Sequence, residues 1–361
     1  MTKDIHKSEF DDGTKIKLEI FKEYLKSWLP TFTKGKQIWW REIDIYDFFA
    51  GEGLDAQGNM GSPLIILDEL KAHHDALIVN NINLRVILNE KLKGKFQILN
   101  LNINSFQPNP PYKIITSQNS FQDFFGDQYT QMSQSPKIPR LIILDQYGIK
   151  EITHDVFRKL TRLERTDFIF FISSSFVRRF SEMEEFKNYI QINKEKFDIS
   201  RPVHSHRVVF EYYKSLLDKN YHLAPFSIKK GSNVYGLIFG SNHTLGLEKF
   251  LKIAWKINRN TGDSNFNIDE EAFLETGQLS LIAEENRPKK LNLFEKSLKT
   301  AILKKELKTN TAIYNYSLDQ GFLPKHANDV LEGMIKDGDI ESVNFATHNI
   351  HKLSPSKLTL K

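Results

Sequence analysis

The sequence contains no cysteine and no long hydrophobic run. Without thiols there is no disulfide framework, thiolate zinc site, protein-ligated iron–sulfur cluster or cysteine nucleophile, so methylation at cytosine C5 is excluded. The apolar runs, such as LIIL at 141–144, fall well short of the roughly 20 residues that cross a bilayer. The first ten residues, MTKDIHKSEF, carry charges where a signal peptide needs an apolar segment. We therefore expect a cytoplasmic protein without membrane contact.

Metal-ligand spacing is also lacking. The 11 histidines show no close pair on one helix face, so no metal site is expected. In contrast, 40% hydrophobic and 12% aromatic residues among 361 are enough for a sizeable core and two or three units. The net charge of +5 is concentrated in residues 287–361, which suggests a polyanionic partner there.

Helical and strand patterns alternate through most of the chain. Helices are expected near 14–29, 62–71 with Ser62 as N-cap, 84–93, 121–131, 153–164, 180–196, 205–217 and 245–257. Strands are expected at 43–49, 76–81, 96–103, 141–145 and 168–173, with a loop over 105–120 and a hairpin over 226–241. Five βα units with a closing antiparallel hairpin predict an α/β fold with a Rossmann-like, methyltransferase-type sheet.

The C-terminal part has a different pattern. Helices over 293–307, 310–319 and 324–336, followed by a strand over 340–345, predict a winged helix-turn-helix. The polar stretch EENRPKKLN at 284–292 is the expected boundary. The predicted organisation is an N-terminal helical segment (1–40), a Rossmann-like methyltransferase-type domain (41–283) and a winged helix-like domain (290–361).

The segment DFFAGEG (47–53) ends the first predicted strand and turns on two glycines. Such a turn brings backbone N–H groups close to a ligand without interference from Cβ. An acid followed by Gly-x-Gly at this place contacts the amino-acid part of S-adenosylmethionine in methyltransferases of this fold. Asp47, Ala50, Gly51 and Gly53 are therefore candidate cofactor-binding residues. The alternative is a purely structural turn.

Amides end the second and third predicted strands, at Asn81 and at Asn102. A carboxylate is usual at the second strand tip, where it binds ribose hydroxyls. Asn81 is the candidate at this place, and Asn102 is the candidate at the third strand tip, where an acid that reads the adenine amino group is expected. The amides leave open a weaker site, a different nucleotide or a vestigial pocket.

Two segments follow the fourth and fifth predicted strands. In DQYG (145–148), Asp145 has the character to orient an amino group and Tyr147 the ring to stack on a base, which makes them the candidate catalytic residues. A strand-ending Asp that caps the next turn is the alternative. In SSSFVRRF (173–180), Arg178 and Arg179 are candidate nucleic-acid contacts, against an N-capping serine with a solvated arginine pair.

The predicted recognition helix of the winged unit carries charges of both signs. Lys325 and Lys336 are candidate phosphate contacts. Asp329, Glu332 and Asp337 on or beside the same helix repel DNA, so docking of a protein is the alternative.

Taken together, these segments resemble the three-Cys-motif partner protein family (TcmP). The resemblance extends over residues 14 to about 270 and is carried by TKIKLEIFKEYLKSW (14–28), DFFAGEG with GSP (61–63), DQYG, FISSSFVRRF (171–180), FSIKKGSNVYGLIFGS (226–241), NHTLGLEKFLKIAW (242–255) and GDSNFNID (262–269). It implies a methyltransferase-like domain and a partner protein with three cysteines that looks like a radical S-adenosylmethionine protein.

Two hypotheses of different classes follow. The first is an S-adenosylmethionine-dependent methyltransferase that acts on DNA or RNA, at a nucleobase amino group. The second is a catalytically degenerate adaptor that binds the three-Cys-motif protein, in a mobile-element or anti-phage locus. A nuclease or nucleotide hydrolase is disfavoured because two-metal chemistry needs clustered carboxylates, and the predicted strand ends offer amides.

Overall fold

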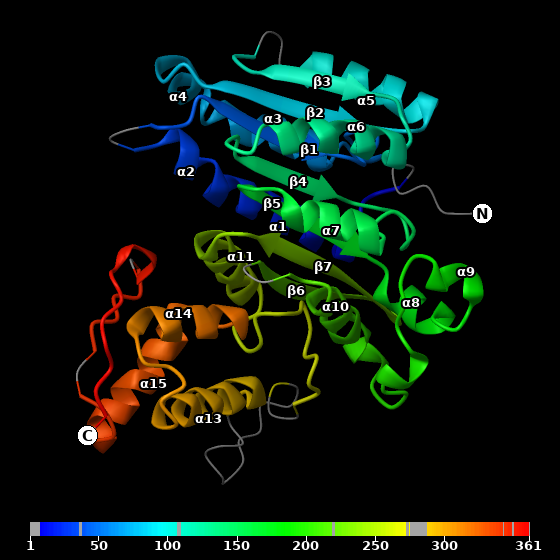
Figure 1. The fold of residues 1–361 in the computed structure, drawn as a ribbon. Coiled ribbons are helices and arrows are strands. Elements are labelled where there is room, and N and C mark those ends of the chain that lie inside the picture. The colour runs from blue at the N-terminus through cyan, green and yellow to red at the C-terminus, as the bar shows by residue number, and fades with distance from the viewer. Residues whose placement is uncertain are drawn as a thin grey trace. The chain divides into compact units, whose positions relative to one another are not determined.

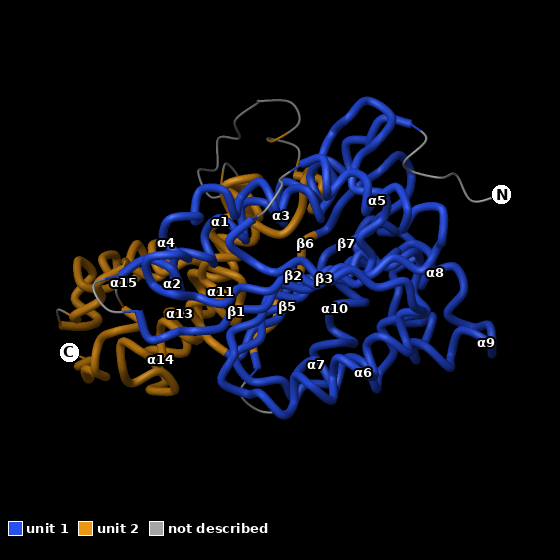
Figure 2. Tube along the Cα trace, turned by 90° about the horizontal axis from the view of Figure 1, so that it is seen from above, with its two compact units in different colours: residues 1–221, 227–242 blue, residues 222–226, 243–361 orange. Residues whose placement is uncertain are grey.

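The computed structural model describes residues 8–35, 38–106, 110–218, 221–271, 274, 287–341, 343–348 and 350–360. It divides into two compact units, residues 1–221 with 227–242 and residues 222–226 with 243–361 (Figure 2). The predicted boundary at 284–292 lies partly outside the described residues, so the predicted domain limits stay a prediction.

A seven-stranded sheet organises the first unit, in the order β3-β2-β1-β4-β5-β7-β6. Its strands are β1 (Glu42–Asp47), β2 (Asn83–Asn89), β3 (Lys113–Ser117), β4 (Arg140–Leu144), β5 (Thr166–Ile172), β6 (His222–Lys230) and β7 (Asn233–Ser241). The pairs among β1 to β5 are parallel, whereas β7 runs antiparallel to β5. This confirms the predicted methyltransferase-type sheet with its closing hairpin.

Helices cover both faces of this sheet. Figures 1 and 2 show α1, α3 and α5 on one face and α6, α7 and α10 on the other. The helices and short 3-10 turns of the unit are α1 (Asp12–Trp28), α2 (Pro30–Thr33), α3 (Ser62–Lys71), α4 (His74–Val79), α5 (Lys93–Phe106), α6 (Phe121–Gln134), α7 (His154–Arg162), α8 (Ser174–Phe180), α9 (Glu184–Lys187), η2 (Lys194–Lys196), η3 (Pro202–His204) and α10 (Ser205–Ser215).

The local sequence explains why α1 forms where it does. Asp11 caps the helix by accepting a hydrogen bond from the backbone N–H of Thr14 at 3.0 Å. Ile20, Tyr24 and Trp28 recur at intervals of four and are all buried, so one face of the helix packs on the unit. The phenol of Tyr24 donates to Asp167 Oδ2 on β5 at 2.6 Å, which fixes the helix to the sheet.

Several predicted elements of the first unit are wrong. Residues 76–81 lie largely in α4 and residues 96–103 lie within α5, whereas β2 occupies part of the predicted helix 84–93 and β3 part of the predicted loop 105–120. Helix α5 buries Leu99 and Ile103, which are four residues apart; the apolar residues of FQILNLNI fit this helical spacing as well as a strand. The predicted helix 180–196 is broken into α8, α9 and η2, and Ser62 is the first residue of α3 rather than its cap.

The second unit contains α11 (Thr244–Ile257), α13 (Lys289–Leu303), α14 (Asn310–Asp319), α15 (Pro324–Asp337) and η5 (Ile350–Lys352). Helices α13 to α15 correspond to the three predicted helices of the winged unit. Among the described residues the expected strand at 340–345 is reduced to one bridge, between Ile340 and Leu360, and a second bridge joins Thr309 to Lys357. Within its described part, the chain has no helix of the length and apolarity that a bilayer span requires.

Candidate functional site

The candidate site is at the carboxyl end of β1. Asp47 ends this strand with its side chain fully buried. Its Oδ1 accepts a hydrogen bond from the backbone N–H of Phe49 at 3.1 Å. Oδ2 is buried and has no hydrogen-bond partner among the described residues. A buried polar atom without a partner is rare in a folded protein, so the carboxylate is suited to receive a ligand.

Burial dominates the electrostatics of Asp47. It raises the pKa of the Asp47 carboxyl from 3.8 to about 7, because a charged group loses its hydration. The Ser62 hydroxyl lowers this pKa, although it forms no hydrogen bond with Oδ2. The N–H of Phe49, which donates to Oδ1, lowers the pKa as well. The negative charge of Asp145 raises it further, while Lys17 acts in the opposite direction. Asp47 is therefore poised between its two protonation states near neutral pH.

The glycine turn has the backbone conformation that its residues predict. Gly51 and Gly53 have φ values of 63° and 90°, in the region that favours glycine. The N–H of Gly61 donates to the carbonyl of Gly53 at 2.8 Å, which closes the loop before α3 begins. The N–H of Ala50 donates to the carbonyl of Asn89 at 2.9 Å, which joins the loop to the tip of β2.

Glu90 is the residue of this site that the sequence analysis missed. It follows β2 directly, and its Oε2 accepts a hydrogen bond from the N–H of Gly51 at 3.1 Å. Its Oε1 accepts from the N–H of Leu92 at 2.7 Å. An acid thus stands at the end of the second strand, next to the glycine turn. The sequence NLRVILN (83–89) with Glu90 after it fits a strand that ends at an acid. The second strand is instead predicted at 76–81.

The two predicted amide positions are not strand tips. Asn81 precedes β2, is exposed and has a left-handed φ of 51°. Since Glu42 of β1 is aligned with Asn83 and Asp47 with Leu88, Asn81 lies at the opposite edge of the sheet from the glycine turn, and its assignment to the site is wrong. Asn102 lies on α5 and donates from Nδ2 to the carbonyl of Glu52 at 2.7 Å. It supports the glycine turn from the helix.

The loop after β4 brings a third part of the chain to this edge. Asp145 forms an ion pair with Lys17 of α1, and both side chains are largely buried. The ammonium group of Lys17 also lies 4.7 Å from the ring centroid of Phe171. The Asp145 carboxylate is thereby already neutralised by a cation of the protein itself, a role that neither sequence alternative included.

The neighbours of Asp145 behave differently from one another. Gln146 is buried and its Oε1 accepts hydrogen bonds from the N–H groups of Glu151 at 3.0 Å and Ile152 at 3.2 Å. Tyr147 is 76% exposed. Its ring is free to meet a planar partner from solution, as the sequence predicts for a stacking residue, and this role stays a prediction.

The segment after β5 makes buried side-chain contacts that the sequence analysis does not predict. The hydroxyl of Ser174 lies 2.9 Å from Nδ1 of His206, and Nε2 of His206 lies 3.0 Å from the carbonyl of Leu237. Because a carbonyl only accepts, Nε2 carries the proton and Ser174 donates to Nδ1. Ser173 stands at the N-cap position of α8, but in the described structure its side chain makes no capping hydrogen bond. This Ser–His pair is fully buried and holds α8, α10 and β7 together.

The two arginines of this segment, Arg178 and Arg179, have different environments. Arg179 donates to Asn233 Oδ1 in the hairpin turn and, from Nε, to the carbonyl of Ser175 at 3.3 Å. It has a structural role. Arg178 instead lines a cavity formed by α8, η2, η3 and α10.

In the winged unit, the candidate phosphate contacts are at the surface. Lys325 and Lys336 are exposed on α15, and so are Asp329, Glu332 and Asp337. His326 lies 4.3 Å, centroid to centroid, from the ring of Trp255, and burial lowers the pKa of its imidazole to about 4. Nucleic-acid contact by Lys325 and Lys336 stays a prediction. In the described ranges of the chain, no group of three or more His, Asp or Glu residues is arranged to hold a metal ion.

Comparisons with known proteins give one family match and several distant structures. Residues 265–344 match the family described as the GMT-like wHTH domain. None of the curated proteins matches the chain.

Similar solved structures share little sequence with this chain. Trm1 from Pyrococcus horikoshii in complex with S-adenosyl-L-methionine is 7% identical over 66% of this chain and 59% of its own, with a TM-score of 0.39. TYW2 of the same organism, in complex with MeSAdo, is 12% identical over 66% of this chain and 65% of its own, with a TM-score of 0.27. An O-methyltransferase from Bacillus cereus in complex with SAH is 13% identical over 64% and 90%, with a TM-score of 0.33. The strand order and the family match together give a methyltransferase-like Rossmann fold with a C-terminal GMT-like winged helix-turn-helix domain.

Proposed function

We propose that this chain binds S-adenosylmethionine at the carboxyl ends of β1 and β2 and is a methyltransferase of the three-Cys-motif partner family that acts on nucleic acid. One observation carries the proposal. The buried Asp47 carboxylate keeps an oxygen without a partner in the described structure, directly before a glycine turn that Glu90 binds. Open α/β sheets bind ligands at this edge, outside the carboxyl ends of their strands.

The residues of this edge fit the cofactor. Each oxygen of Glu90 accepts one backbone N–H, and an ionised carboxylate has about four acceptor positions, so two remain for ribose hydroxyls. Asp47 would accept from the ammonium group of the methionine part, which favours its ionised form. The positive φ values of Gly51 and Gly53 set the tight bend that joins β1 to the following loop. The bound cofactor supplies a methyl group activated on a sulfonium.

On the acceptor side, Tyr147 supports a nucleobase as the substrate. Its ring is exposed on the loop that begins with Asp145 of the buried Asp145–Lys17 pair, and base–aromatic stacking contributes about 1–3 kcal/mol. In this proposal Tyr147 positions the base. Asp145 does not take its proton, because Lys17 already holds the carboxylate. The winged helix would contact the DNA or RNA strand through Lys325 and Lys336.

Calorimetric titration with S-adenosylmethionine and S-adenosylhomocysteine tests the cofactor site. Glu90→Gln should weaken binding about 10- to 100-fold, since a neutral amide replaces charge-assisted acceptors for the ribose. Glu164→Gln is the matched control, because this exposed residue of the same unit lies after α7 and away from β1; it should leave the affinity unchanged. No heat from the unaltered protein at millimolar ligand, or equal affinity in Glu90→Gln, would remove the proposal.

A second candidate is the adaptor that binds a three-Cys-motif protein without catalysis. The support from amides at strand tips is lost, because Glu90 follows β2. The ion pair between Asp145 and Lys17 favours the adaptor, because it leaves the loop after β4 without a free carboxylate for proton transfer. Co-expression with the three-cysteine protein should give a stoichiometric complex on gel filtration, unchanged by Asp47→Ala. Failure to form the complex, or its loss in that variant, counts against the adaptor.

A further inference from the structure

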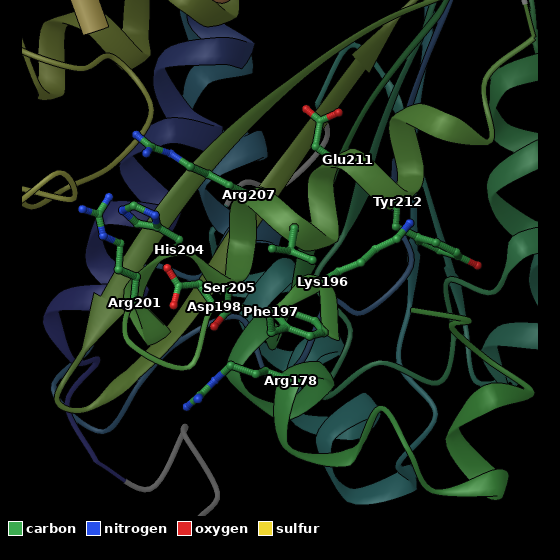
Figure 3. Close-up of a pocket in the computed structure, with 11 residues that line it drawn as sticks. Arg178, Lys196, Phe197, Asp198, Arg201, His204, Ser205, Arg207, Glu211 and Tyr212 are labelled. Atoms are coloured by element: carbon green, nitrogen blue, oxygen red, sulfur yellow. The ribbon is translucent and has the colours of Figure 1, made fainter. Parts of the chain in front are cut away.

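A cavity of about 380 Å³ lies in the first unit and shares no lining residue with the candidate cofactor site. It is lined by residues of α8, α10 and the segment between them: Arg178, Lys196, Phe197, Asp198, Arg201, His204, Ser205, Arg207, Val208, Glu211 and Tyr212. In the view of Figure 3, Arg201, His204 and Arg207 gather on one side, and Arg178 lies at the bottom. This volume is at the lower end of the range for small-molecule sites, roughly 300–1,000 Å³.

The lining is cationic. Four basic residues and only two acidic ones line the cavity: Arg178, Lys196, Arg201 and Arg207 against Asp198 and Glu211. Asp198 is engaged locally, because its Oδ1 accepts from the N–H of Ser200 at 2.8 Å and from its hydroxyl at 2.6 Å. These bonds lower the pKa of Asp198, so it stays ionised and does not take a proton from a ligand. In Figure 3, Glu211 lies at the opposite end from Arg178. The cavity keeps an excess of positive charge.

Arg178 gives the second, independent observation. Its Nε is buried and has no hydrogen-bond partner in the described part of the chain. The adjacent Arg179, in contrast, uses its guanidinium on Asn233 and Ser175. A buried N–H without an acceptor is costly, and an anionic oxygen in the cavity would satisfy it. A planar guanidinium suits phosphate because it offers parallel N–H donors.

The cavity also has an apolar lining, from Phe197, Val208 and the ring of Tyr212. An inorganic anion would leave this surface uncovered. A ligand with a phosphate and an attached apolar or aromatic part would use both kinds of lining.

We propose that this cavity binds a nucleoside monophosphate unit, with the phosphate held by Arg178 and attracted by the other cationic side chains, and the nucleoside on the apolar lining. The unit is either a free mononucleotide or the phosphorylated 5′ end of a strand, which share this chemistry. The site uses none of the β1–β2 residues, so it is independent of the cofactor proposal and is measured without S-adenosylmethionine.

The test uses the full chain and three probes: adenosine 5′-monophosphate, inorganic phosphate, and a fluorescein-labelled hexauridylate with either a 5′-phosphate or a 5′-hydroxyl. Adenosine 5′-monophosphate is titrated by calorimetry, and the strands by fluorescence anisotropy. Arg178→Gln should weaken binding of the phosphorylated probe at least about tenfold, as expected for loss of a hydrogen bond to a charged group. Arg201→Gln, at an exposed position, should act in the same direction without a risk to folding.

Arg158→Gln is the matched control, because it removes an exposed arginine of α7 in the same unit, outside the cavity. It should change the affinity less than twofold. Competition separates the sources: displacement of the phosphorylated strand by adenosine 5′-monophosphate supports the shared site, binding of the strand alone identifies a strand end, and binding of the mononucleotide alone identifies the free ligand. The proposal is overturned if neither phosphorylated probe binds, if both arginine variants bind as the unaltered chain does, or if inorganic phosphate competes as strongly as the mononucleotide.

Discussion

Asp47→Asn is expected to stabilise the first unit by about 4 kcal/mol at pH 8 and to leave it nearly unchanged at pH 4. The pKa of the Asp47 carboxyl is about 7 in the folded chain, above its usual 3.8. The folded state therefore holds a proton that the unfolded state releases, and the unaltered protein loses stability as the pH rises from about 4 through 7. An amide stays neutral across this window, so the gain grows with pH and then levels off.

Urea unfolding followed by circular dichroism at pH 4, 6 and 8 measures this effect. Asp127→Asn on α6 is the control, because Asp127 is exposed and should give the same difference at all three values. If Asp47→Asn has no effect that depends on pH, or destabilises the chain at pH 8, the carboxyl is not buried as described.

The same substitution should weaken binding of S-adenosylmethionine, because the amide has no charge to pair with the ammonium group. Binding to the unaltered chain should tighten between pH 6 and pH 8 as Asp47 ionises. A residue that costs stability and supports binding is the pattern expected at functional sites. Stability and affinity that changed in the same direction would indicate a structural role for Asp47 instead.

Much of the fold could be predicted from local patterns. The strands β4 and β5 contain short apolar runs, β1 alternates apolar and acidic residues, and the hairpin of β6 and β7 surrounds a Gly-Ser-Asn turn. Helix α11 and the three helices of the winged unit show helical spacing with clear limits at Pro324 or before Gly321. In each case the pattern and the tertiary environment favour the same element.

The errors at β2 and β3 have a physical cause. Arg85 interrupts the apolar run of β2, which makes NLRVILN look half polar. In the fold this charge pairs with Asp44 on the adjacent strand, so it does not oppose burial of the strand. β3 has only five residues, none of them buried, and carries a weak pattern. Both strands form because they pair with strands that are distant in the sequence. A local periodicity pattern cannot predict such pairing.

The candidate site divides in the same way. Asp47, Gly51 and Gly53 were identifiable because the strand, the acid and the glycines adjoin one another in the sequence. Glu90 was missed with its strand. The partner of Asp145 could not be predicted, because Lys17 lies on α1, 128 residues away, and looks like any exposed helical lysine. Residues that form a contiguous motif could be predicted from the sequence. Residues whose role depends on a partner distant in the sequence could not.

Asp44→Ala is expected to destabilise the first unit by about 3–5 kcal/mol, as for removal of one partner from a buried ion pair. Asp44 and Arg140 are both fully buried, on the adjacent strands β1 and β4. Asp44 accepts two hydrogen bonds of 2.7 Å from Arg85, and its Oδ2 lies 3.7 Å from Nε of Arg140. Burial lowers the pKa of the Arg140 guanidinium and Asp44 opposes this, so without Asp44 an uncompensated cation remains between the strands.

Urea unfolding measures the loss, and hydrogen exchange of the β1 and β4 amides assigns it to the first unit. Arg85→Ala is the matched comparison: Arg85 is partly exposed, and its removal leaves Asp44 beside Arg140, so the loss should be smaller. The double variant Asp44→Leu with Arg140→Met should recover most of the stability, because apolar side chains then replace both charges. A double variant as unstable as Asp44→Ala would mean that the hydrogen bonds of Arg140 to Ser135, at 2.7 and 2.6 Å, stabilise this region more than the removal of charge does.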